Sequence, residues 1–174
     1  MTNPDSAPNL NWHILYTYPR YERKVHNHLL RNNFNSFLPV HTIVKQWSDR
    51  KKKTEVPLFP NYIFVQTTTN KCFRVLDFHG ISHFIAFNGN PVVVGDEVIQ
   101  TIKKMMGTSN LSVEERLIVG DKVLIQGGIF DGLTGIVYRK NGRSRFCVQI
   151  SAINQIISVD IDTSDVSMIK LVKQ

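Results

Sequence analysis

Residues 58–65 read Leu58-Phe59-Pro60-Asn61-Tyr62-Ile63-Phe64-Val65, a tight turn that leads directly into an apolar run. Proline fixes φ in the turn and asparagine tolerates left-handed geometry, so a buried strand should begin at Tyr62. An earlier segment from Trp12 to Tyr18 alternates aromatic or aliphatic residues with other types, which is the period-two pattern of a strand. If the two strands pair, their aromatic residues form one apolar patch.

Helical and turn signals complete an α+β first domain. Tyr21, Val25 and Leu29 recur every four positions and predict an amphipathic helix over 21–32, and a second helix is expected over 96–106. The pattern over 40–56 predicts a hairpin with a basic tip at 48–51, and residues 82–94 predict a smaller hairpin. A short helix is expected over 71–78.

The composition changes after residue 108. Residues 108–116 are polar and lack an apolar period, so they predict a linker. Five β-branched runs between 119 and 171, separated by turns with glycine or asparagine, then predict a small β-barrel. The expected organisation is therefore a disordered tail (1–11), a first domain (12–107), a linker (108–116) and a second domain (117–174).

The charge balance favours a polyanionic partner. The 174 residues carry 21 basic and 14 acidic groups, a net charge of +7, and most of this excess lies before residue 107. No apolar run is long enough to span a membrane, and the two cysteines stand far apart, so a cytoplasmic protein without a disulfide framework is expected.

Enzyme signatures are missing from the sequence. There is no phosphate-binding GxxxxGK[ST], no GxGxxG, no HExxH and no GxSxG, and the six histidines do not meet carboxylates at metal-ligand spacing. We therefore expect no catalytic residues, no metal and no organic cofactor. A hydrolase or transferase is the weakest of the functional readings.

Two sets of residues are candidates for binding. Lys24, His28 and Arg31 follow at i, i+4 and i+7 and share one helix face, where they could neutralise phosphates or form a solvated surface. The basic run 50–53 could be a solubilising hairpin tip. The second set is aromatic, and it is either the core of the first domain or a docking surface for a partner helix; core is the default. Its members are Trp12, Tyr16, Phe59, Tyr62 and Phe64.

Several motifs in fixed order resemble the NusG family of transcription elongation factors. They are Trp12-His13-Ile14-Leu15-Tyr16, Tyr21-Glu22-Arg23-Lys24-Val25, the 58–65 stretch, Gly80-Ile81-Ser82-His83-Phe84 and, after the linker, Gly120 to Val137. The resemblance covers nearly everything after residue 11. It implies a NusG N-terminal (NGN) αβ sandwich domain followed by a five-stranded SH3-like β-barrel, the KOW domain.

The resemblance also implies a mechanism without catalysis. The first domain would dock on the clamp helices of the largest RNA polymerase subunit through Tyr16, Tyr62 and Phe64, supported by Trp12, Ile14 and Phe59. In RfaH-like members the first helix also touches the non-template DNA strand, and Lys24, His28 and Arg31 occupy the matching positions. Arg20 and Arg23, from the same basic segment, are further candidates for nucleic-acid binding. The KOW domain would bind ribosomal protein S10 or the termination factor Rho through Phe130 and Ile153. A monomer is expected.

Some segments resemble specialised members of the family. Residues 58–62 and 80–84 are similar to RfaH-type antiterminators, and Val44 to Lys52 is similar to UpxY-type antiterminators of surface polysaccharide operons. Lys71-Cys72-Phe73 stands where RfaH-type proteins place a His-Thr-Thr triplet. The expected function is antitermination at such operons. The alternatives are a general housekeeping factor and an RNA-binding or ribosome-associated KOW protein, which the basic turn 139–145 would support.

RfaH-type proteins can fold the second domain as a helical hairpin that masks the first. The β-branched pattern of 119–171 favours a stable barrel in this chain.

Overall fold

The computed structural model describes residues 10–46, 50–68, 71–108, 111–114, 120–162 and 167–171. The chain divides into two units, Met1–Asp96 and Glu97–Gln174. The boundary falls at the start of the helix over 96–106, which the sequence assigned to the first domain, so nearly all of that helix belongs to the second unit. The predicted tail at 1–9 and most of the predicted linker lie outside the described residues. The domain limits inferred from the sequence stay a prediction.

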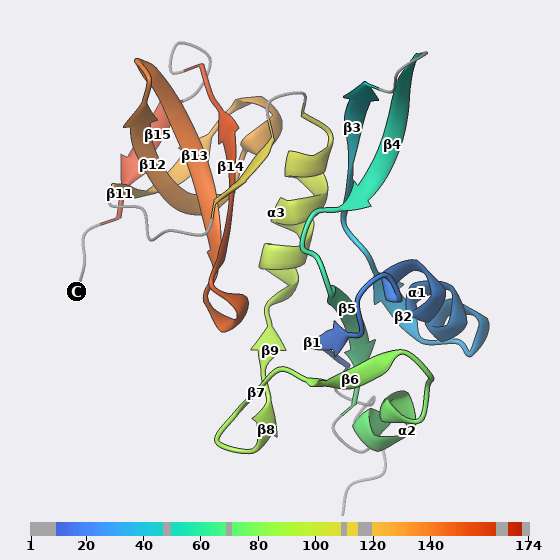
Figure 1. Cartoon of the computed structure of the whole chain (residues 1–174). Helices are drawn as coiled ribbons and strands as arrows, with labels where there is room; N and C mark the ends of the chain where they lie inside the picture. Colours follow the sequence, from blue (N-terminus) through green and yellow to red (C-terminus); the bar gives the residue numbers. More distant parts are fainter. Residues whose placement is uncertain are drawn as a thin grey trace, which may run out of the picture. The chain divides into compact units, whose positions relative to one another are not determined.

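An antiparallel sheet with the order β2-β5-β1-β6 forms the first unit (Figure 1). Its strands are β1 (Asn11–Thr17), β2 (Asn35–Phe37), β5 (Tyr62–Thr67) and β6 (Ile81–Phe84), and a short β9 (Val93–Val94) also pairs with β1. The two strands with aromatic patterns, β1 and β5, are therefore neighbours, as the sequence predicted.

Two helices pack on one face of this sheet. They are α1 (Glu22–Arg31), which confirms the predicted amphipathic helix, and the short α2 (Cys72–Leu76). Gly80 has φ +100°, and a side chain there would overlap the ring of Tyr21, so only glycine fits beside the helix. The core under the helices consists of Leu15, Val25, Leu29, Leu38, Ile63, Val65, Cys72, Val75, Ile81 and Phe84.

Two hairpins extend the first unit. The longer pairs β3 (Val40–Gln46) with β4 (Lys51–Pro57), and the shorter pairs β7 (Ala86–Phe87) with β8 (Asn90–Pro91). Both were predicted from the sequence. The tip residues 47–49 of the longer hairpin lie outside the described residues.

The second unit contains helix α3 and a curved antiparallel sheet (Figure 1). α3 (Asp96–Met106) buries Ile99, Ile102 and Met105 and has the bounds predicted from the sequence. The sheet has the order β10-β14-β13-β12-β11-β15. Its strands are β10 (Ser112–Glu114), β11 (Asp121–Gln126), β12 (Thr134–Lys140), β13 (Arg143–Ile150), β14 (Gln155–Asp160) and β15 (Ser167–Lys170).

All five strands predicted for the second domain form, and together with the helices and sheet of the first unit they confirm the predicted α+β fold class. A sixth strand, β10, lies in the segment that the sequence predicted as a linker, and it pairs with β14. Arg145 holds it there, because its guanidinium donates to Ser112 Oγ at 2.6 Å and to Ser158 Oγ at 3.2 Å. None of the helices in the described residues has the length and apolar character needed to span a bilayer.

Candidate functional site

The register between β1 and β5 builds one aromatic face. Ile14 lies directly opposite Phe64, and Tyr16 lies opposite Tyr62. Directly paired residues of an antiparallel sheet project from the same side, so these four side chains share a face. The predicted pairing and the resulting patch are both present.

Most of this face is buried. Trp12, Ile14, Phe59 and Phe64 are inaccessible or nearly so, whereas Tyr16 and Tyr62 are partly exposed. Phe64 was expected at the surface, but its ring packs 6.2 Å from that of Phe59 and 5.9 Å from that of Phe37, measured between ring centroids. Phe64 is therefore a core residue, and like Trp12, Ile14 and Phe59 it supports the partly exposed Tyr16 and Tyr62.

Three side chains form what we call the aromatic patch: Tyr16, Tyr62 and His83. The Tyr16 ring meets the Tyr62 ring edge to face at 5.3 Å and stacks on His83 at 5.2 Å, with 30° between the planes. The pKa of Tyr62 is raised, mainly because the phenol is buried and to a smaller extent because Tyr16 lies beside it. The sequence does not mark His83 as a site residue, because its pairing with Tyr16 across β1 and β6 depends on the register of two distant strands.

The turn at Asn61 fixes the aromatic patch against helix α1. Asn61 has φ +69°, as the sequence suggested, and its N–H donates to Glu22 Oε1 at 2.9 Å. Its carbonyl accepts hydrogen bonds from the Thr17 N–H at 2.8 Å and the Thr17 hydroxyl at 3.3 Å. Asn61 Nδ2 also approaches the Tyr16 hydroxyl at 3.5 Å. Strand β1, the turn and the first residue of α1 are thus joined by hydrogen bonds.

The exposed side of α1 carries the basic stripe, which we define as Lys24, His28 and Arg31. Together with Asn27 these side chains line a shallow depression of about 370 Å³, so the structure brings the three predicted residues together. Two of them rest on aromatic rings: Lys24 Nζ lies 5.1 Å from the centroid of Tyr21, and the His28 ring lies 4.6 Å from Phe78. These contacts place the Lys24 ammonium and the His28 ring against aromatic side chains.

Two other predicted nucleic-acid-binding residues lie apart from the basic stripe. Arg23 forms an ion pair with Glu55 on β4, with 3.1 Å between Nη2 and Oε2, and also donates to the Glu55 carbonyl at 3.1 Å. Arg20 is exposed in the turn before α1, where its φ is +69°. The ion pair of Arg23 could not be predicted from helix periodicity, because its partner is 32 residues away.

The two predicted partner-binding residues of the second unit are buried. Phe130 packs on Phe146 with 5.9 Å between ring centroids, and Ile153 is 7% exposed. The neighbouring Ile129 is 67% exposed, in the short 3-10 turn Gly128–Phe130. The accessible apolar side chain of this loop is therefore Ile129, which the sequence reading did not single out.

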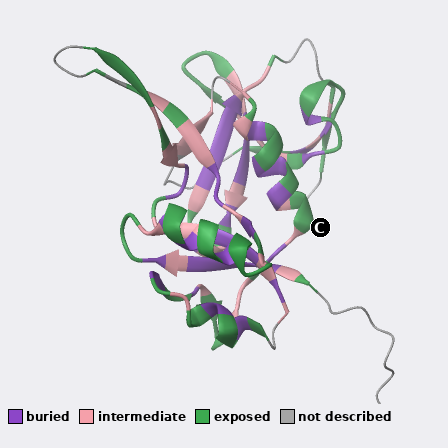
Figure 2. Cartoon of the chain, turned by 90° about the vertical axis from the view of Figure 1, so that its right-hand side faces the viewer, coloured by how far each residue is buried: buried purple, intermediate pink, exposed green. Residues whose placement is uncertain are grey.

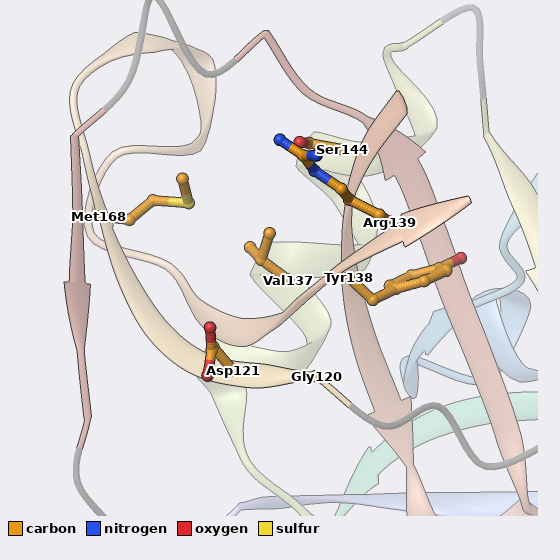
Figure 3. A pocket seen from close by; sticks show the side chains of 7 residues that line it. All are labelled: Gly120, Asp121, Val137, Tyr138, Arg139, Ser144 and Met168. Atoms are coloured by element: carbon orange, nitrogen blue, oxygen red, sulfur yellow. The ribbon is translucent and has the colours of Figure 1, made fainter. Parts of the chain in front are cut away.

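An open hollow of about 660 Å³ lies on the second unit between strands β11, β12, β13 and β15 (Figure 3). Val137 and Met168 provide apolar walls, and Arg139 extends toward Ser144 at its rim (Figure 3). Asp121 at its other side is paired with Lys170 at 2.9 Å. In the described part of the chain no group of histidine, cysteine and carboxylate side chains could hold a metal ion.

Two histidines of the first unit have internal partners. His13 is buried with Nδ1 3.0 Å from the Val92 carbonyl, and burial lowers its pKa although this contact opposes the shift. His26 Nδ1 lies 2.9 Å from Ser36 Oγ, and burial together with the charge of Arg23 lowers its pKa. Both rings are held in the neutral form by their surroundings and belong to the scaffold.

Comparison with known proteins agrees with this arrangement. A family model described as "Transcription termination factor nusG" matches residues 10–103. The transcription termination/antitermination protein NusG of Lactococcus lactis subsp. lactis is 27% identical over 173 residues, which cover 91% of this chain and 93% of that protein. NusG of Staphylococcus aureus (strain Mu50) is 29% identical, over 72% of this chain and 77% of its own.

The fold has a solved counterpart. The structure of Thermotoga maritima NusG superposes with a TM-score of 0.51 at 23% identity, covering 91% of this chain and 96% of that one. The family model spans more than half of the 174 residues and includes β1, the aromatic patch and α1. The chain therefore belongs to the NusG family.

Proposed function

We propose that this transcription termination/antitermination factor of the NusG family binds RNA polymerase in the cytoplasm and suppresses pausing and termination. The observation that carries the proposal is the pairing of two exposed surfaces on one unit, the aromatic patch and the basic stripe, which the Glu22–Asn61 hydrogen bond joins. One surface suits a protein partner and the other suits a polyanion. No catalysis is required.

The aromatic patch is the proposed docking surface for the clamp helices of the largest polymerase subunit. Tyrosine and histidine present an apolar ring and a polar tip, a combination enriched at protein interfaces. Trp12, Ile14, Phe59 and Phe64 form the rigid layer beneath, so little conformational entropy is lost when a partner docks. The buried residues support binding without touching the partner.

The basic stripe is the proposed contact for the non-template DNA strand. Lys24 and Arg31 provide positive charge, and the His28 ring, stacked near Phe78, offers a face for an unpaired base. Arg20 extends the positive surface at the start of α1. Arg23 contributes less to phosphate binding, because its charge is already paired with Glu55.

We further propose a specialised role at surface polysaccharide operons, because Val44 to Lys52 resembles the UpxY-type antiterminators that serve such operons. The two segments that resemble RfaH-type proteins, 58–62 and 80–84, come together in the structure, where Tyr62 and His83 both contact Tyr16. This convergence supports a shared function for the two segments. A general housekeeping factor is the alternative, and it would act on every transcript.

The second unit is the proposed site for ribosomal protein S10 or Rho, with Ile129 as the exposed apolar contact. The RNA-binding alternative relied on the basic turn 139–145. Arg143 and Arg145 both pair with the single carboxylate of Asp160, at 3.2 and 2.9 Å, which offsets one of their two charges. Arg139 and Lys140 on β12 are both exposed, so the turn keeps a basic surface, and the RNA-binding alternative remains the second candidate.

Transcription by the host polymerase through a terminator, on templates with and without a candidate operon leader, tests the proposal. Read-through only with the leader supports a recruited antiterminator. Read-through on every template supports the housekeeping alternative. Tyr62→Ala should abolish both polymerase binding and read-through, and a Tyr62→Ala protein that binds polymerase normally would contradict the docking assignment.

A further inference from the structure

The hairpin of β3 and β4 is a two-stranded arm that the proposed function leaves without a role. Seven residue pairs, from Val40↔Pro57 to Gln46↔Lys51, join its strands, and in the described residues neither strand pairs with the main sheet. Figure 2 shows its outer half largely exposed, in contrast to the purple strands of the cores. Such an arm buries little apolar surface, so its sequence is free to serve binding.

Positive charge occupies both faces of the arm. Lys51, Lys52 and Lys53 are consecutive on β4 and all are exposed. Because alternate residues of a strand point to opposite faces, Lys51 and Lys53 project on one side and Lys52 on the other. Two residues of a strand advance by about 6.6–6.8 Å, so Lys51 and Lys53 span about two successive phosphates of one DNA strand.

Glu55, the carboxylate on β4 nearest to these lysines, does not neutralise their positive charge. Glu55 is compensated by Arg23, which also donates to the Glu55 carbonyl and thereby anchors the base of the arm on helix α1. Over 45–55 the sequence has five basic residues (Lys45, Arg50, Lys51, Lys52, Lys53) and two acidic ones (Asp49, Glu55). An anion approaching the exposed lysines meets a net positive field.

We propose that the β3–β4 arm binds double-stranded DNA by entering the major groove, with its lysines contacting the flanking phosphates. The major groove of B-DNA, about 12 Å wide, admits a two-stranded ribbon, and a ribbon with cations on both faces can reach both backbones. The major groove of duplex RNA is too deep and narrow for a ribbon, so the arm prefers DNA. Lysine makes point-charge contacts, hence binding is independent of base sequence.

This duplex site is separate from the single-strand contact proposed for the basic stripe, and it does not depend on polymerase. The test measures binding of the full chain to a short fluorescent DNA duplex between about 50 and 200 mM salt. Each phosphate-bound lysine contributes about 1 to the slope of log affinity against log salt, so Lys51→Gln/Lys52→Gln/Lys53→Gln should lower that slope by about 3. Affinity should fall equally for unrelated duplex sequences.

A variant with the same loss of charge elsewhere is the control. Lys71→Gln/Arg74→Gln/Lys122→Gln removes three exposed cations outside the arm and should leave the salt slope nearly unchanged. Equal losses in the two triple variants would show that duplex binding follows net charge alone and would overturn the proposal. So would undetectable duplex binding by the unsubstituted chain, or a duplex RNA affinity as high as that for DNA. If the lysines only protect the strand edges from aggregation, the two triple variants should lose duplex affinity equally.

Discussion

Replacing Phe64 by alanine separates the two readings of the aromatic face, core and docking surface. Phe64 is fully buried, and its ring lies near those of Phe37 and Phe59. Deleting such a ring costs about 3–5 kcal/mol of the free energy of unfolding, a large share of the roughly 5–15 kcal/mol typical of a domain. With a urea m-value of about 2 kcal/mol/M, the midpoint of the first unit should fall by about 1.5–2.5 M.

Tryptophan fluorescence measures this unit separately. The chain has two tryptophans, Trp12 and Trp47, and both lie in the unit Met1–Asp96, so the signal reports its unfolding and not that of the second unit. Tyr62→Ala is the matched control, because Tyr62 is only partly buried and loses one edge-to-face ring pair, which contributes about 0.5–1.5 kcal/mol beyond its buried area. Equal midpoint shifts for the two variants, or a shift below about 0.5 M for Phe64→Ala, would refute the assignment of Phe64 to the core.

Three further changes test the scaffold. Glu22→Ala removes the acceptor of the Asn61 N–H and should cost about 1–3 kcal/mol in the same fluorescence assay, whereas Glu22→Gln, which keeps an oxygen, should recover part of the loss. Arg145→Met should accelerate amide exchange in β10, because the Arg145 side chain is only 14% exposed and donates a hydrogen bond to Ser112 of that strand. Arg143→Met should leave the exchange unchanged, because the Arg143 side chain is 73% exposed. Folding lowers the pKa of His13, so its contribution to the free energy of unfolding is complete above about pH 6.5 and is lost as pH falls toward the folded pKa. His13→Gln should therefore make the free energy of unfolding fall less steeply in that range. An unchanged pH profile in the variant would contradict this assignment.

Local signals in the sequence were enough to place most elements. Helix α3 follows from the spacing of Ile99, Ile102 and Met105, and its observed bounds equal the predicted ones. The strand β5 follows from the turn at Pro60 and Asn61, since proline and a left-handed asparagine leave few other conformations. In each case neighbouring residues carry the whole signal.

Contacts between distant segments could not be predicted in the same way. Strand β10 has only three residues and depends on Arg145, which is 33 positions from Ser112. The stacking of His83 on Tyr16 requires the register of β6 against β1, which includes an irregularity at Tyr16 and Thr17. Apolar character alone also could not tell Ile129, which is exposed, from Phe130, which is buried.

The geometry of the first unit links its two proposed binding surfaces through one residue of α1. Glu22 opens the helix that carries the basic stripe, and its carboxylate holds the turn that positions Tyr62. Thr17, at the end of β1, is bound to the same turn through the Asn61 carbonyl. A partner that docks on the aromatic patch therefore also determines the direction of α1, because a tilt of the helix would have to break these hydrogen bonds. In the proposed function, docking on the aromatic patch and the presentation of Lys24, His28 and Arg31 to a DNA strand therefore become one event.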